Sequence, residues 1–197
     1  MDVGAWLAVP ITLLFLDLVS YGWHRANHVV PFLWRLHRVH HSDPTFTVST
    51  GLRFHPGELV LSLPLRLGAV ILIGASVLAV LVFEVVFALA NLVEHGDIEV
   101  HRGVETALAK VFITPALHRR HHTRVGPARD SNFGTIFSLW DRFFATCTPS
   151  DSATHVETGL PDVAADIDFG RLLLLPLREP RGGGWVQHPS DGRADAG

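Results

Sequence analysis

Long apolar and polar stretches alternate along most of the chain. Residues 4–23 are mostly apolar and have about the length of a membrane-spanning helix, and residues 59–93 are almost entirely apolar. One helix over residues 59–93 would be roughly 52 Å long, whereas the bilayer hydrocarbon is about 30 Å thick. We therefore expect two antiparallel helices joined by a turn within residues 68–76. The pattern predicts three transmembrane or hairpin helices, at about 4–28, 59–74 and 75–95.

The stretches between these helices are polar and rich in histidine and arginine. Arginines concentrate in residues 24–56, which places this stretch in the cytosol by the positive-inside rule. Together with residues 95–148 it is expected to form a helical cap on the cytosolic side. The sequence thus predicts an all-α integral membrane domain over residues 1–148 and a C-terminal extension over residues 149–197. The last ~20 residues, rich in Pro, Gly, Arg and Asp, are expected to be disordered.

Composition narrows the classes of protein that fit this pattern. At 197 residues the chain has the size of one domain, and its mean hydropathy of +0.28 suits a protein with membrane spans. The formal net charge of -3 gives no indication of nucleic-acid binding. One cysteine, Cys147, excludes an internal disulfide framework and a cysteine-based zinc or iron–sulfur site. Any metal is therefore held by nitrogen ligands, either alone or together with oxygen ligands.

Histidine is concentrated in short groups whose spacings fit one face of a helix. Nine of the thirteen histidines follow this pattern: two groups have the spacing i, i+3 and i+4, one has the spacing i and i+4, and one histidine stands alone. They are His37, His40 and His41; His118, His121 and His122; His24 and His28; and His95. Imidazole is the commonest side-chain metal ligand near neutral pH. The repeated spacing beside apolar spans therefore predicts metal binding.

The number and type of these residues indicate which metal chemistry to expect. A catalytic zinc site needs about three protein ligands, so nine histidines suggest two metals with four or five ligands each. Imidazole ligands suit iron, zinc or copper better than magnesium or calcium. Redox iron with O2 can attack an unactivated C–H bond of a lipid. A metal-dependent hydrolase more often has a carboxylate base in its motif, as in His-Glu-x-x-His, where this chain has residues such as Arg, Val and Asn.

Two residues near the histidines have alternative interpretations. Asp17 shares a helix face with Tyr21, His24 and His28. It either holds a ligand histidine by its second ring nitrogen, or it caps or pairs near the membrane surface. His55 is a further metal ligand, a residue of the substrate site, or a histidine at a helix start that is bonded to the backbone.

Six motifs occur in an order and spacing that resemble a known family. They are Asp17-x3-Tyr21-x2-His24-Arg25-x2-His28, Trp34-Arg-Leu-His37-Arg-Val-His40-His41-Ser42, His55-Pro56-x-Glu58, Asn91-x3-His95, Thr114-Pro-x2-His118-Arg-x-His121-His122 and Asn132-Phe-Gly-x5-Trp140-Asp141-Arg142-x-Phe144. Over roughly residues 10–148 the chain resembles the fatty acid hydroxylase / sterol desaturase superfamily.

The resemblance implies a membrane oxygenase with two iron ions in its active state. It would use O2 and electrons from a separate donor, such as a ferredoxin or a cytochrome b5-type protein with its reductase. Members hydroxylate or desaturate lipids such as fatty acyl chains and sterols, and zinc can displace iron in purified protein. Their fold is a transmembrane helical base with a cytosolic helical cap that holds the metals. Carried over to this chain, the metal ligands are His24, His28, His37, His40, His41, His95, His118, His121 and His122.

The same interpretation assigns supporting roles around the metals. The residues expected to hold or orient metal ligands are Asp17, Asn91, Asp141, Glu94 and Glu99, the last two on adjacency alone. The lipid is expected to occupy a tunnel lined by apolar side chains from residues 59–93 and 133–144. Arg38, Arg119 and Arg120 are expected to meet lipid headgroups or an acidic electron donor.

The sequence departs from the family pattern at two points. Members generally have another transmembrane helix before the one that carries Asp17, so we expect a truncated N-terminus or a misassigned start; with three spans, the N-terminus would lie outside. Some members have a histidine where this chain has Asn91, which leaves three alternatives: ligation through its carbonyl oxygen, binding of a metal-bound water, or an open position on one metal. The competing functional interpretations are a non-redox zinc-binding membrane protein with a lipid-binding or scaffold role, and a zinc-dependent hydrolase.

Overall fold

The computed structural model describes residues 3–149 and 156–179, and the regular structure within them is helical. One isolated antiparallel bridge, between Phe112 and Phe137, is the exception. The α-helices are α1 (Val3–Val29), α2 (Pro31–His41), α3 (Pro56–Ile73), α4 (Val77–Glu94), α5 (Arg102–Leu108), α6 (Pro115–His121), α7 (Leu139–Phe143) and α8 (Phe169–Leu174). The short 3-10 helices are η1 (Val48–Leu52), η2 (Pro127–Asp130) and η3 (Leu175–Leu177). The all-α prediction is confirmed for the described part of the chain.

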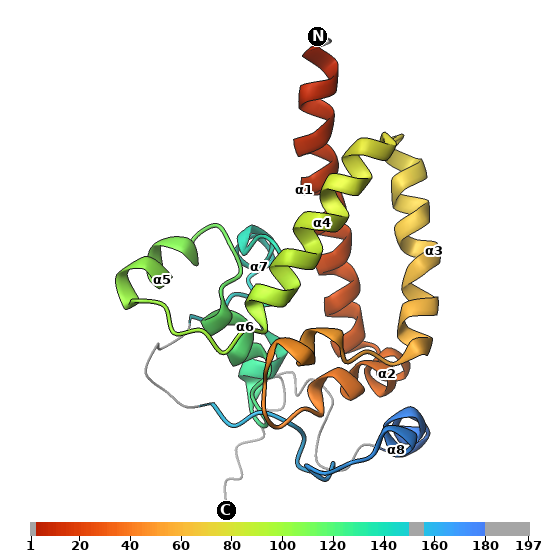
Figure 1. The fold of residues 1–197 in the computed structure, drawn as a ribbon, viewed down its shortest axis with the longest axis vertical. Helices are drawn as coiled ribbons and strands as arrows, with labels where there is room; N and C mark the ends of the chain where they lie inside the picture. Colours follow the sequence, from red (N-terminus) through yellow and green to blue (C-terminus); the bar gives the residue numbers. More distant parts are fainter. Residues whose placement is uncertain (1–2, 150–155, 180–197) are drawn as a thin grey trace, which may run out of the picture.

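Three of these helices, α1, α3 and α4, are long and apolar enough to cross a membrane. Figure 1 shows α3 and α4 as a hairpin beside α1. Gly74 ends α3 with a φ of 63°, in the left-handed region that glycine adopts without strain. Ser76 then caps α4 by accepting a hydrogen bond from the amide of Ala79 at 3.2 Å. The turn lies within the predicted window, and the expectation of three helices of spanning length is confirmed.

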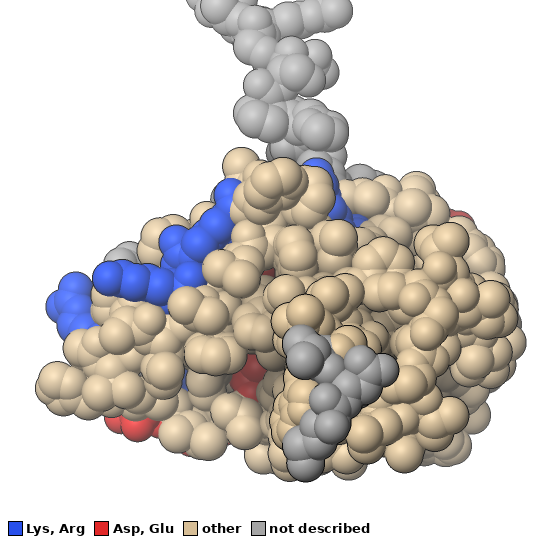
Figure 2. Space-filling view, turned by 90° about the horizontal axis from the view of Figure 1, so that it is seen from above, with Lys and Arg blue, Asp and Glu red and all other residues tan. Residues whose placement is uncertain are grey.

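Most apolar side chains of the long helices face outward instead of packing into a core. Leu72 is 80% exposed and Val77 is 77% exposed. A small core that includes Leu16, Phe83 and Ile136 joins the long helices to the segment after α6. Viewed from the upper end of α1, the surface consists mainly of uncharged residues, and Lys and Arg gather along one side (Figure 2). Apolar surface of this extent is stable in lipid and not in water, so this is a membrane protein.

The helices that carry the histidine groups begin where their sequences favour a helix start. Pro31 occupies the first turn of α2, directly after α1 ends at Val29, because proline is tolerated there but would break a helix interior. In α6, Pro115 follows Thr114, whose hydroxyl accepts a hydrogen bond from the amide of Leu117 at 3.4 Å. Figure 1 shows α2 and α6 at the same end of the three long helices. The two groups with i, i+3 and i+4 spacing are thereby brought together.

The segment after residue 156 packs against the outer side of α2. Arg38 of α2 pairs with Asp162 and donates a hydrogen bond to the backbone oxygen of Arg178 at 3.3 Å. Arg38 is 1% exposed, so the prediction that it meets headgroups or an electron donor is wrong. Its partners lie more than a hundred residues away in the sequence, which hides the pairing from local patterns. The predicted disordered segment lies, apart from its first residues, outside the described part of the chain.

Candidate metal centre

The structure brings the nine histidines of the four sequence groups together in two clusters. The five-histidine cluster consists of His24, His28, His37, His41 and His121. The four-histidine cluster consists of His40, His95, His118 and His122. Within each cluster, one ring nitrogen from every histidine lies within 4.8 Å of the others. All nine side chains are buried except His24, which is partly buried. Each cluster therefore has the ligand types and the spacing that a metal ion needs.

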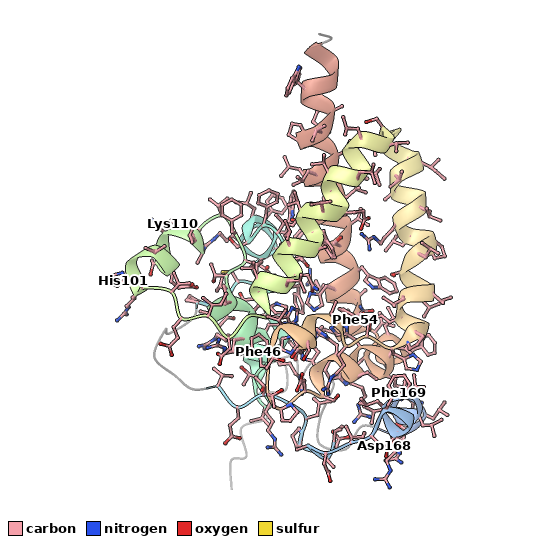
Figure 3. The ribbon with its side chains drawn as sticks, in the orientation of Figure 1. Phe46, Phe54, His101, Lys110, Asp168 and Phe169 are labelled. Atoms are coloured by element: carbon pink, nitrogen blue, oxygen red, sulfur yellow. The ribbon has the colours of Figure 1, made fainter. Side chains whose placement is uncertain are left out.

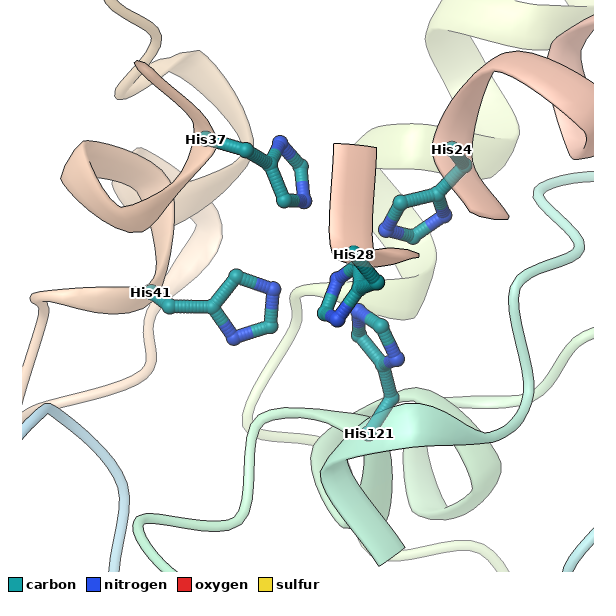
Figure 4. Close-up of side chains that lie close together, drawn as sticks. All are labelled: His24, His28, His37, His41 and His121. Atoms are coloured by element: carbon teal, nitrogen blue, oxygen red, sulfur yellow. The ribbon is translucent and has the colours of Figure 1, made fainter. Parts of the chain in front are cut away.

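The helical spacing explains how α2 and α6 each contribute to both clusters. The i, i+4 pair of each helix points to one cluster, and the remaining histidine points to the other. The pairs are His37 and His41 on α2, and His118 on α6 with His122, the residue that directly follows α6. His40 consequently joins the α6 pair, and His121 joins the α2 pair. Figure 4 shows the five-histidine cluster, in which α1 adds His24 and His28 to the rings from α2 and α6.

Two carboxylates contact the Nδ1 atoms of histidines in the five-histidine cluster. Glu58 Oε1 lies 3.0 Å from His37 Nδ1, and Asp130 Oδ1 lies 3.2 Å from His28 Nδ1. A carboxylate in this position accepts a hydrogen bond from Nδ1–H, so the proton stays on Nδ1 and the lone pair is on Nε2. The two rings are therefore fixed in the tautomer and orientation of a ligand that binds through Nε2.

Backbone carbonyls do the same for two more rings of this cluster. The oxygen of Phe133 lies 2.8 Å from His24 Nδ1, and the oxygen of Ser131 lies 2.7 Å from His121 Nδ1. The Nε2 atoms of His24, His28, His37 and His121 are buried and have no hydrogen-bond partner among the described residues. Buried polar atoms normally have a partner, so four such nitrogens that converge on one point fit a metal ion.

In the four-histidine cluster the Nε2 atoms themselves converge. His118 Nε2 lies 2.9 Å from His95 Nε2, His95 Nε2 lies 3.2 Å from His40 Nε2, and His122 Nε2 lies 3.2 Å from His118 Nε2. Neighbouring ligands have such separations when they surround one ion at bond lengths of roughly 2.0–2.1 Å. Behind the rings, the oxygen of Thr50 lies 3.1 Å from His40 Nδ1. This cluster also fits one metal ion.

Burial keeps the imidazoles of the cap in the neutral form that binds metals. It lowers the pKa of His95 to about 4. Burial, reinforced by the neighbouring imidazoles, also holds the pKa of five others well below the usual range: His40, His41, His118, His121 and His122. These rings carry no ligand-blocking proton at neutral pH, so a metal does not have to displace one.

Phe46 and Phe54, labelled in Figure 3, lie in the segment between α2 and α3 and pack against the four-histidine cluster. Phe54 stacks on His40, with ring centroids 4.7 Å apart and 6° between the ring planes. The ring centroid of Phe46 lies 5.0 Å from that of His122 and 5.7 Å from that of His95. Phe46 has a φ of 46°, a conformation that non-glycine residues rarely adopt and that buried packing has to maintain. Neither phenylalanine has a signal in the sequence pattern.

Asp17 is buried, but its hydrogen bonds go to a loop and not to a histidine. The carboxylate accepts hydrogen bonds from the amides of Ile136 and Phe137 at 3.1 and 3.2 Å, and from the indole N–H of Trp140 at 2.8 Å. The prediction that Asp17 holds a ligand histidine directly is therefore wrong. The shared face with His24 indicated the right helix side, but the partner of Asp17 comes from a distant segment.

Asp141 also accepts hydrogen bonds from this loop, which contains residues 133–137. Its two carboxylate oxygens accept hydrogen bonds from the amides of Phe133 and Gly134, each at 2.8 Å, and a third from the hydroxyl of Thr146 at 2.7 Å. A Cβ at Gly134 would lie 2.5 Å from the oxygen of Phe137, so only glycine fits there. Asp17 and Asp141 thus position the loop whose Phe133 carbonyl holds His24.

Asn91 and Glu94 lie at the end of α4 beside the four-histidine cluster. The backbone oxygen of Asn91 lies 2.7 Å from His95 Nδ1, and its side-chain Nδ2 donates to the oxygen of Gly51 at 2.8 Å. The buried carboxylate of Glu94 lies 3.8 Å from His95 Nδ1 and 3.7 Å from His118 Nδ1. Asn91 therefore supports His95 through its main chain, whereas Glu94 lies near two rings at distances longer than a hydrogen bond.

His55 and Glu99 lie outside both clusters. His55 Nδ1 accepts a hydrogen bond from the amide of Gly57 at 3.0 Å, and its Nε2 lies 3.2 Å from the oxygen of Leu173. Of the three alternatives for His55, the structure supports the histidine that caps a helix start, and the expectation of an additional metal ligand is not met. Glu99 is exposed in the loop after α4, so adjacency in the sequence was misleading.

Sequence reasoning missed the groups that hold the five-histidine cluster from behind. Glu58 stands in the motif that contains His55, and Asp130 lies in the polar loop before Asn132. Both carboxylates could have been proposed from their position beside a motif. The carbonyls of Ser131 and Phe133 could not, because every residue has one and only the fold selects which of them meets a histidine.

A cavity of about 150 Å³ lies between α1, α3 and α4 and ends at the histidines. The two clusters contribute His24, His37, His40, His95 and His118 to its wall. The rest of the wall comes mainly from the three long helices, with Thr135 from the segment after α6. The expected apolar lining is confirmed in part: Leu59, Leu65 and Phe87 come from residues 59–93, but Thr135, the contribution of residues 133–144, is polar, and the share of α1 was not expected. The arrangement places a group inside the cavity next to both clusters.

The chain is similar in sequence to known proteins. The fatty acid hydroxylase family model matches residues 9–146. The chain is 30% identical to an ornithine lipid hydroxylase of Rhizobium tropici over 75% of this chain and 44% of that protein. It is 33% identical to an alkylglycerol monooxygenase of Caenorhabditis elegans over 68% of this chain and 26% of that protein. It is 28% identical to a cholesterol 25-hydroxylase of Rattus norvegicus over 72% of this chain and 47% of that protein.

The chain spans less than half the length of these three relatives. No solved structure matches it significantly. The family match nevertheless runs from α1 to Thr146, so it includes all nine clustered histidines and the loop that Asp17 and Asp141 position. Because the match covers most of the chain and the whole candidate metal centre, this chain belongs to the fatty acid hydroxylase family.

Proposed function

We propose that this chain is a membrane-bound di-iron oxygenase that hydroxylates or desaturates a lipid. The observation that carries the proposal is the convergence of nine histidines, in two clusters, at the end of a cavity between apolar helices. The names of the relatives, which are lipid hydroxylases and monooxygenases, support the same class of reaction. The proposed reactants are O2 and a lipid such as a fatty acyl chain or a sterol.

The nine clustered histidines are the proposed ligands of two iron ions. Imidazole suits iron, and bound iron would supply the oxidising chemistry with O2. The protein determines where that chemistry acts. Glu58 and Asp130 fix the orientation of His37 and His28, and Asn91 does so for His95 through its backbone oxygen. The cavity orients a lipid segment against both clusters and keeps water away from it.

We further propose a multi-pass topology with the active site on the cytosolic side. The clusters lie at the ends of the long helices that adjoin the arginine-rich residues 24–56, which supports this orientation. Electrons would come from a separate donor such as a ferredoxin or a cytochrome b5-type protein. Arg119 and Arg120 on α6 are partly exposed beside the four-histidine cluster and are suitably placed to attract an acidic donor.

Metal analysis of detergent-purified protein from iron-replete cells tests the proposal. We expect about two irons per chain by elemental analysis, and coupled, reducible iron by Mössbauer spectroscopy. A chemical reductant and a membrane-lipid extract should then give O2 consumption and an oxygenated or desaturated lipid. Protein that holds only redox-inert zinc, and that consumes no O2 after reconstitution with iron, would contradict the oxygenase. Protein that binds no metal would contradict the metal centre itself.

A further inference from the structure

An ion pair joins two of the apolar helices at a distance from the histidines. Arg66 of α3 donates a hydrogen bond from Nη2 to Oε1 of Glu84 on α4 at 2.6 Å. The guanidinium also lies 5.2 Å from the ring centroid of Phe87 and 5.9 Å from that of Phe83. Charged residues inside apolar spans are costly, and they usually mark a functional site. Neither residue belongs to the metal centre, so the pair needs another explanation.

Arg66 lines the same cavity as the histidines. It stands eight residues after Glu58, which holds His37, so the two positions are about 12 Å apart along α3. The cavity thus has a histidine end and a charged end. The side chains of Arg66 and Glu84 are 35% and 47% exposed, which places the charged end where the cavity meets its surroundings.

The size of the cavity determines how a lipid can use these two ends. Its volume of about 150 Å³ is below the roughly 300–1,000 Å³ of pockets that enclose drug-sized ligands. It therefore encloses a segment of a lipid, and the remainder of the molecule extends past Arg66. A substrate whose reacting carbon lies at the clusters must place another part of its chain against the guanidinium.

We propose that Arg66 is a specificity-determining residue that binds a neutral, hydrogen-bond-accepting oxygen of the substrate, such as an ester or amide carbonyl. A guanidinium has five N–H donors, and the one side-chain hydrogen bond that the described residues give Arg66 goes to Glu84. Because Glu84 already neutralises the guanidinium, an anionic ligand would add an uncompensated charge in an apolar setting. A neutral oxygen takes a hydrogen bond without that cost. The inference rests on the proposed function, which assigns the cavity to a lipid, and it specifies a lipid with a neutral oxygen in the part that extends from the clusters past Arg66.

The competing explanation is that the pair only fastens α3 to α4. Exchanging the two residues separates the explanations, because Arg66→Glu with Glu84→Arg restores an ion pair but moves the guanidinium to the other helix. Replacing both residues by Met removes the polar groups, and it is expected to preserve folding because apolar residues commonly replace such a pair without loss of stability. Arg171→Met is the matched control, since Arg171 pairs with Asp168 at 3.1 Å outside the cavity.

The test compares the binding of methyl palmitate and octadecane, which have similar chain lengths but differ in the ester group. Binding to detergent-purified, iron-loaded protein is measured as ligand-dependent thermal stabilisation. The unmodified protein and the Arg171→Met variant should bind methyl palmitate about tenfold more tightly than octadecane, as one charged hydrogen bond provides. The exchanged and double-Met variants should bind both probes equally.

Two results would overturn the inference: equal binding of both probes by the unmodified protein, or an ester preference that survives in the exchanged or the double-Met variant. The test measures binding and needs no turnover. Its outcome therefore does not depend on whether the protein is an active oxygenase. An ester preference without redox iron would contradict only the oxygenase, and O2-consuming protein without an ester preference would contradict only the role of Arg66.

Discussion

The two histidine clusters consist of the same side chain but are supported differently. In the five-histidine cluster, the carboxylates of Glu58 and Asp130 and two backbone carbonyls lie against Nδ1 atoms. In the four-histidine cluster, the hydrogen-bonded Nδ1 atoms face the backbone oxygens of Thr50 and Asn91, and Glu94 lies at 3.7 Å from a third ring.

This difference indicates different roles for two metals bound at these clusters. A carboxylate behind an imidazole makes it a stronger ligand, and five ligands enclose an ion more completely than four. The four-histidine cluster contributes three of its rings to the cavity wall and has one ligand fewer. We infer that the five-histidine cluster retains its metal more tightly and that the four-histidine cluster is the more accessible to reactants.

Removing one ligand from each cluster should have the largest effect and tests the comparison directly. His122→Ala leaves three imidazoles in its cluster, so we expect iron content to fall to about one per chain and activity to fall at least about 100-fold. His41→Ala leaves four imidazoles and should keep both irons. Elemental analysis and O2 consumption measure the two outcomes. Equal iron loss in both variants would contradict the inferred difference.

Weakening the carboxylate support should have a smaller effect that is confined to one cluster. Glu58→Gln removes the charge behind His37, and we expect the metal affinity of the five-histidine cluster to fall about 10–100-fold. Competition with a chelator measures the affinity of each site. The exposed Glu99 provides the control, because Glu99→Gln should leave both sites unchanged. If Glu58→Gln instead released the metal of the four-histidine cluster first, the conclusion that Glu58 supports the five-histidine cluster would be wrong.

Acidification should destabilise the metal-free protein. The pKa of His95 is about 4 in the folded chain, against roughly 6.5 in an unfolded one, so the unfolded state binds more protons in this window. The free energy of unfolding is therefore highest above about pH 6.5 and falls as the pH decreases toward 4, and the other buried imidazoles of the cap act in the same direction. Thermal melts across this pH range check the sign. Greater stability at pH 5 than at pH 7 would contradict the buried, neutral rings.

The smallest effect is expected for Asp17→Asn. This change weakens the hydrogen bonds to Ile136, Phe137 and Trp140, which should lower stability by about 1–3 kcal/mol. Iron content should stay unchanged, because Asp17 positions a loop and not a ligand. Thermal unfolding measures the stability of the variant, and elemental analysis measures its iron content. Loss of iron at full stability would contradict this role and favour the alternative in which Asp17 supports a ligand histidine.

The sequence predicts the features that depend on local periodicity. The apolar stretches define α1, α3 and α4, and the i, i+3 and i+4 spacing brings His37, His40 and His41 to adjoining faces of α2. The division between clusters was not predicted: the sequence pattern placed the three histidines of each group on one helix face, whereas the structure directs the i, i+4 pair to one cluster and the remaining histidine to the other.

The remaining contacts depend on which distant segments meet. Asp17 has its partners about 120 residues away, and Arg38 has its own 124 and 140 residues away. The periodicity of one helix carries no information about such partners. His55 was ambiguous for the same reason, because the amide that it caps is local but the second contact, with Leu173, is not.

The shared use of α2 and α6 has a consequence for how this centre can change over evolutionary time. A one-residue insertion in either helix would turn its histidines by about 100° and remove ligands from both clusters at once. A length change in either helix before its histidines is therefore expected to affect both metal positions together. Sequence variation is instead expected in the residues of the cavity and of the outer segments. Substrate specificity can then change while the two metal positions are inherited together.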